Sequence, residues 1–184
     1  MKFQDSTLRW ALTYAHKGFA IIPTETPTHQ EYAVQSRFRL LEWPSIPSSD
    51  PATIASWYLR APYAGIAVGL GPSGMLAVEI TGEEGSATFG TLMDDHEDWF
   101  PWETASFEAG ETRTLLYRAG GLCIDSDVEL GPGVVARGAG HVILPPSQDN
   151  AGVFHQWDDP DDLTVSAPPQ WLVEKLSPFV KVAA

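Results

Sequence analysis

The chain has 184 residues, 43% of them hydrophobic and seven of them tryptophan, so it is long enough and apolar enough to bury a core. Lys and Arg number 11 against 24 Asp and Glu, which gives a formal net charge of -13. This charge argues against broad binding to nucleic acid, because such binding relies on a basic surface that neutralises phosphates. Cys123 is the only cysteine, so neither an intrachain disulfide nor a cysteine-based zinc site can form.

The sequence also bears on the compartment. The residues MKFQDSTLRW lack a long apolar core, so we expect no signal peptide. There is no run of 18 apolar residues, so we expect no membrane span and no membrane partner. With a single cysteine, the reducing cytoplasm is the expected location.

The first half of the chain mixes helix and strand patterns. Ser6 is expected to cap a helix that ends at Gly18, and the strand 19–24 follows, stopped by Pro23. Residues 25–47 are predicted as a long loop. Asp50 and Pro51 mark the start of a second helix, as N-cap and first helical residue. The segments GIAVGLG (65–71) and MLAVEI (75–80) are predicted as two strands of one sheet, and residues 83–99 as a helix.

From residue 103 onward short strand patterns follow one another, bounded by glycine or proline. They are ETASFEA, RTLLYRA, VELG, VVARG, HVILPPS and VFHQW, before a closing helix in PPQWLVEKL. This order predicts an α+β fold built on a mixed or antiparallel sheet with flanking helices. The whole chain, 1–184, is expected to form a single domain.

Six stretches of the chain carry a family pattern when they are taken in order: ALTYAHKGFAIIP, SSDPATIASWYLRAPYAGIAVGLG, SGMLAVEIT, RTLLYR, GPGVVARGAGHVILPPS and PPQWL. Together they resemble the N-terminal domain of bifunctional DNA primase/polymerases, within the archaeo-eukaryotic primase superfamily. The likeness spans roughly residues 8–175. The resemblance implies a primase-type α+β domain. For active members, the resemblance implies that three aspartates hold two divalent metals: two from an Asp-x-Asp strand and one from an Asp-x-Arg-Gly segment. It also implies a histidine near the triphosphate of the incoming nucleotide.

This chain departs from that pattern at each carboxylate after the first. Glu79 stands at the first aspartate position, Thr81 at the second and Val135 at the third, whereas Arg137 still matches. Two-metal catalysis needs several converging oxygen ligands, and hard ions such as Mg²⁺ favour carboxylates. A threonine hydroxyl is a poor substitute, and valine offers no ligand.

The nucleotide side departs as well. Where the family has Ser-Gly-Gly-x-His, this chain reads Gly110 to Thr114, so that Thr114 replaces the histidine and Glu111 would repel phosphate. The resemblance implies nucleotide-binding positions at Arg113, Thr114 and Arg137. Glu79 is then either a weak metal ligand or a strand-end carboxylate paired with Arg113 or Arg137; we favour the ion pair.

The sequence therefore favours a catalytically impaired member that acts by binding a protein partner or a replication complex of a mobile element or phage, with weak or no nucleic-acid binding. One alternative is an active primase/polymerase that uses Mg²⁺ or Mn²⁺ at Glu79, with an unconventional ligand set drawn from carboxylates such as Asp125, Asp127 or Glu129. A second alternative is an acidic inhibitor or nucleic-acid mimic, which would display carboxylates in rows on one face.

Other polar and aromatic groups have simpler interpretations. The acidic runs 94–98 and 158–162 are expected to be a solvated helix end and a solvated loop, because neither has a complete set of metal ligands. His141 is expected to fill space at the start of a strand, and His16 and His155 follow no pattern. The aromatic group Trp99, Phe100 and Trp102 is expected to pack in the core or against a partner protein.

Overall fold

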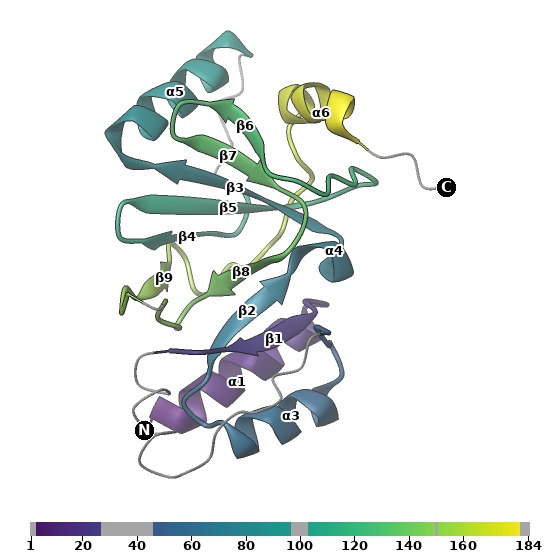
Figure 1. Ribbon diagram of the computed structural model, residues 1–184, viewed down its shortest axis with the longest axis vertical. Helices are drawn as coiled ribbons and strands as arrows, with labels where there is room; N and C mark the ends of the chain where they lie inside the picture. Colours follow the sequence, from purple (N-terminus) through teal and green to yellow (C-terminus); the bar gives the residue numbers. More distant parts are fainter. Residues whose placement is uncertain (1–2, 27–45, 97–102, 150, 181–184) are drawn as a thin grey trace. The chain divides into compact units, whose positions relative to one another are not determined.

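The computed structural model describes residues 3–26, 46–96, 103–149 and 151–180. Within them the chain divides into two compact units, one formed by Met1–Ser73 with His141–Gln156 and the other by Gly74–Gly140 with Trp157–Ala184. Each unit therefore draws on two separate stretches of sequence. Helices accompany antiparallel strands in both units, so the predicted α+β class is confirmed (Figure 1).

Among its described residues, the first unit holds three helical segments and a three-stranded antiparallel sheet in the order β1-β2-β8. Asp50 caps α3 as predicted, because its carboxylate accepts the backbone N–H of Thr53 at 2.8 Å. The first helix begins at Phe3 and not after Ser6, since no proline or glycine before Ser6 breaks it. The elements are α1 (Phe3–His16), β1 (Ile21–Thr24), α3 (Pro51–Arg60), β2 (Gly65–Gly69), α4 (Leu70–Ser73) and β8 (His141–Leu144).

The second unit is built on a larger sheet, whose described strands lie in the order β6-β7-β3-β5-β4-β9. The elements are β3 (Met75–Thr81), α5 (Gly82–Asp95), β4 (Ser106–Ala109), β5 (Thr112–Arg118), β6 (Val128–Gly131), β7 (Val134–Arg137), β9 (His155–Trp157), α6 (Gln170–Leu176) and a 3₁₀ turn (Ser177–Phe179).

The prediction that residues 65–71 and 75–80 are strands of one sheet is wrong. Strand β2 pairs with β1 and β8, whereas β3 pairs with β5 and β7. Leu70 is fully buried, and Leu70–Ser73 coils into one helical turn that leads the chain from one sheet to the other. The helix predicted for 83–99 runs from Gly82 to Asp95, and its expected last residues lie outside the described part of the chain.

One face of the larger sheet is covered by α5 and α6 (Figure 1). Alternate residues of β3 point into this core, because side chains of a strand alternate between its faces. The core residues are Leu76, Val78 and Ile80 from β3, with Phe89, Leu92 and Met93 from α5 and Trp171, Leu172 and Leu176 from α6. None of the described helices is long and apolar enough to cross a membrane.

Candidate functional site

Glu79 lies on the opposite face of the larger sheet, turned away from α5 and α6. Its register partners are Thr114 on β5 and Val135 on β7. Directly paired residues of antiparallel strands project to the same side, so these three side chains form one row across the sheet. Val135 in turn pairs with Glu129 of β6, which extends the row to a second carboxylate. Neighbouring strands are about 4.8 Å apart, so the backbones of Glu79 and Glu129 are about 10 Å apart.

The three positions that the sequence analysis aligned with family carboxylates, Glu79, Thr81 and Val135, therefore lie on this face. Thr81 lies two residues beyond Glu79 on β3 and projects to the same side. Its hydroxyl is 3.1 Å from the hydroxyl of Thr112 on β5, and the two share a hydrogen bond. Val135 adds a partly buried hydrocarbon side chain. Of these three side chains, Glu79 alone carries a carboxylate.

Arg137 is the ion-pair partner of Glu79. Strand β7 pairs Arg137 with Ala77, so the guanidinium reaches diagonally toward Glu79 on the same face. Arg137 Nε lies 3.2 Å from Glu79 Oε2 and 3.5 Å from Asp127 Oδ2. One cation thus lies between two carboxylates, of which Glu79 is the less exposed: its side chain is 22% accessible against 55% for Asp127.

The protonation of Glu79 reflects this half-buried position. Burial raises the pKa of Glu79 above its ordinary value, because a desolvated carboxyl disfavours its charged form. The positive charge of Arg137 lowers the pKa in part, and the negative charge of Asp127 raises it again. Desolvation is the largest of the three effects, so the ion pair does not fully compensate for the burial of the carboxylate.

Arg113 lies on the other face of the sheet from Thr114 and Arg137. It pairs with Ile80 of β3 and Glu108 of β4, and successive strand residues alternate in direction. Its guanidinium forms an ion pair with Glu108, and its Nε lies 3.5 Å from Asp158 Oδ2. The structure thus brings together Glu79, Thr114 and Arg137, and it separates Arg113 from them.

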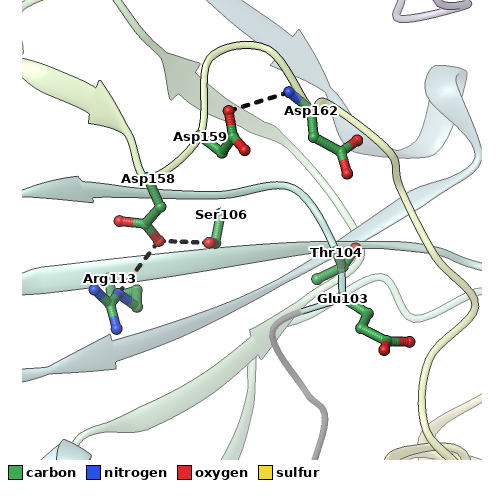
Figure 2. Close-up of a pocket in the computed structure, with 7 residues that line it drawn as sticks. All are labelled: Glu103, Thr104, Ser106, Arg113, Asp158, Asp159 and Asp162. Carbon is green, nitrogen blue, oxygen red and sulfur yellow. Dashed lines mark hydrogen bonds and ion pairs between the residues drawn. The ribbon is translucent and has the colours of Figure 1, made fainter.

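Arg113 borders a pocket of about 330 Å³, shown in Figure 2. The hydroxyl of Ser106, on β4, donates to the carboxylate of Asp158. On the rim, the carboxylate of Asp159 stabilises its own loop: its Oδ1 atom accepts hydrogen bonds from the backbone N–H groups of Asp161 and Asp162 at 2.9 and 3.3 Å. Residues 158–162 are exposed, as expected for a solvated loop. No sequence pattern links Arg113 to Asp158, because the contact forms only when the chain returns beside β4.

A second hollow, of about 700 Å³, opens at the start of α5 and is lined by Gly82, Glu83, Ser86 and Glu111. The N-terminus of a helix normally attracts anions, because its free N–H groups and its dipole are positive. Here the acidic side chains of Glu83, Glu84 and Glu111 gather at that end of the helix or around the hollow. Their negative charge opposes the approach of a phosphate group.

The donor set on the face of Glu79 does not fit a two-metal centre. Such a centre needs oxygen ligands that converge on two ions about 4 Å apart. Glu79 and Asp127 are the carboxylates that approach each other there, with the guanidinium of Arg137 between them, and the backbone of Glu129 lies about 10 Å from that of Glu79. Within the described parts of the chain, no three histidine, cysteine, aspartate or glutamate side chains form a group that could hold a metal.

The other candidate residues lie away from the Glu79 face or outside the described residues. His141 is the first residue of the edge strand β8 and is exposed to solvent. The expectation that it fills space is therefore wrong. His155 is partly buried in β9, where burial lowers its pKa and the charge of Asp149 raises it in part. Asp94 is exposed at the end of α5, whereas residues 97–98 and the aromatic group Trp99, Phe100 and Trp102 lie outside the described residues.

Comparison with known proteins identifies the family. The family model of the N-terminal domain of bifunctional DNA primase/polymerases matches residues 11–171. A search of curated proteins found no match. The family match covers well over half of the chain and includes every residue of the Glu79 face described above. The chain therefore belongs to the family of bifunctional DNA primase/polymerase N-terminal domains.

Proposed function

We propose that this primase/polymerase-like domain has lost nucleotidyl transfer and acts by binding, in the replication of a mobile element or phage. The observation that carries the proposal is the row Glu79–Val135, with Thr81 beside it. These positions converge as a catalytic centre requires, but two of the three side chains lack a carboxylate. A two-metal mechanism depends on several carboxylates to hold both ions. A site with one of these three carboxylates therefore supports a function in binding a partner and not in nucleotidyl transfer.

The nucleotide side of the domain supports the same conclusion. Thr114 stands where the family has a histidine, and its side chain is 4% exposed, buried between β3 and β4. Glu111 and Glu83 place negative charge at the start of α5. Arg113, a predicted nucleotide-binding residue, is engaged by Glu108 and Asp158. Of the three positions named for the nucleotide, Thr114 and Arg137 lie on the face of Glu79 and Arg113 lies on the other.

The function proposed is therefore that of a binding component. The net charge of -13 disfavours broad contact with nucleic acid, so the expected partner is a protein of the replication complex. The family usually works beside such proteins, which is the ground for the mobile-element or phage context. The cytoplasm is the location that this role requires.

An active enzyme is the second candidate, and one observation favours it. Asp127 lies close to the cation that Glu79 contacts, and Glu129 lies in register with Val135. These two carboxylates are ones that the family pattern does not use. If they moved toward Glu79, they would supply the unconventional ligand set that Mg²⁺ or Mn²⁺ would require.

Primer synthesis and extension with the purified chain separates the two candidates. The assay uses all nucleotides with Mg²⁺ or Mn²⁺, and it compares the native protein with Glu79→Gln and with Glu174→Gln. Glu174 is an exposed residue of α6, which packs on the opposite face of the sheet, so it is a matched control. We expect no synthesis with either metal. Synthesis that survives in Glu174→Gln and disappears in Glu79→Gln would refute the proposed function.

A further inference from the structure

We propose that the guanidinium of Arg137 is the resident cation of the Glu79 face, and that it keeps divalent metal out of the space between Glu79 and Asp127. The inference deepens the proposed function and rests on it. Arg137 thus supplies the positive charge that a metal ion would otherwise bring to the two carboxylates.

The contacts place Arg137 where a bridging ion would lie. Its Nε atom is within 3.5 Å of both carboxylates, one from β3 and one that precedes β6. Arg137 comes from β7, the strand between them in the sheet. The position is therefore set by the register of three strands, and the side chain needs no rearrangement to reach it.

In the family pattern the matching arginine stands beside three carboxylates, whereas here Arg137 contacts two, so charge balance makes arginine and metal compete for them. Two carboxylates and one guanidinium carry a net charge of -1. A divalent ion added to the group would place three positive charges against two negative ones, with the ion beside the guanidinium. Like charges at such short distances repel strongly in a half-buried site, where the dielectric constant is lower than in water. The metal would have to displace Arg137.

The side chains on this face offer too few oxygen ligands for a metal ion to displace Arg137. Mg²⁺ requires six oxygen ligands in near-octahedral geometry and loses its waters reluctantly. The hydroxyl of Thr81 is hydrogen bonded to Thr112, and Val135 contributes no donor. Arg137 is covalently held in β7 beside both carboxylates, whereas a metal ion must be captured from solution. The tethered cation is therefore favoured over the free one.

Removal of Arg137 should then open a cation site. In Arg137→Gln the two carboxylates lose their positive partner, and Mn²⁺ can take its place with water completing the coordination. Arg137→Lys keeps the charge and is the matched control. Because the Arg137 side chain is 37% exposed, both substitutions are compatible with the fold.

The test is Mn²⁺ binding by electron paramagnetic resonance, without nucleotide or DNA. We expect Arg137→Gln to bind Mn²⁺ at least about tenfold more tightly than the native chain. The gain should vanish in Glu79→Gln/Arg137→Gln and be absent in Arg137→Lys. An equal affinity in the native chain and Arg137→Gln, or a gain that persists in the double variant, would overturn the inference.

A measurement on the native chain covers the case in which Arg137→Gln fails to fold. If Arg137 is the resident cation, Mn²⁺ shifts the melting temperature of the native chain by no more than it shifts that of Glu79→Gln under the same salt. A rise in the native chain alone would show metal bound at Glu79 and would refute the inference. Primer synthesis is scored separately: synthesis would refute the proposed function, whereas the Mn²⁺ titrations decide the role of Arg137.

Discussion

The contact between Gly85 and Gly133 yields the sharpest stability prediction for the unit that carries Glu79. Gly85 lies in the first turns of α5, and Gly133 in the turn between β6 and β7. A Cβ atom added to Gly85 would lie 2.5 Å from the carbonyl oxygen of Gly133 and 3.1 Å from its carbonyl carbon. That oxygen also accepts the N–H of Thr81 at 2.8 Å, so it cannot move away freely.

The magnitude follows from two opposing effects in Gly85→Ala. Alanine stabilises a helix interior by about 0.5–1 kcal/mol relative to glycine. Overpacking against a rigid backbone costs about 1–3 kcal/mol. Gly90 provides the matched control: it lies in the same helix, is exposed, and has no atom within 4 Å of an added Cβ. We expect Gly90→Ala to gain about 0.5–1 kcal/mol and Gly85→Ala to lose up to about 2.5 kcal/mol.

Urea unfolding of the intact chain measures both variants. The comparison of Gly85→Ala with Gly90→Ala cancels the helix propensity and leaves the steric cost, about 1–3 kcal/mol. Hydrogen exchange at α5 checks that the loss arises in this helix. If Gly85→Ala were as stable as Gly90→Ala, the close approach of helix and turn would not exist, and the reasoning would be refuted.

Two further predictions concern buried polar groups. Because burial raises the pKa of Glu79 above its unfolded value of about 4.3, its contribution to the unfolding free energy is fully present below about pH 4 and is lost as the pH rises through the folded pKa. Native protein should therefore lose stability relative to Glu79→Gln over that range in urea titrations, and a pH-independent difference would contradict this. Ser147→Ala removes the acceptor, at 2.7 Å, of the buried Ile66 N–H and should cost about 1–3 kcal/mol by thermal unfolding. The exposed control Ser86→Ala should change stability by less than about 0.5 kcal/mol, and equal losses in the two would contradict the assignment.

Local sequence patterns were sufficient for much of the fold. Asp50 and Pro51 are a strong helix start, because the cap needs only its own carboxylate and the next three residues. The run MLAVEIT predicts a strand, and its alternation places Glu79 and Thr81 on one face without further information. The link between β2 and β3 was misjudged, because a short glycine-containing segment fits a hairpin turn and a helical turn equally well.

The partners of Glu79 could not be derived in the same way. Arg113 and Arg137 are equally plausible in the sequence, and the register of β3 with β5 and β7 puts them on opposite faces. Asp127 also forms an ion pair with Arg137, and the residues before β6 that carry Asp127 follow no pattern that would predict this contact. The sequence by itself determined that one carboxylate stands at the end of a buried strand, because strand alternation is a local property. The tertiary structure decided which cation lies beside it, because strand register joins residues that are far apart along the chain.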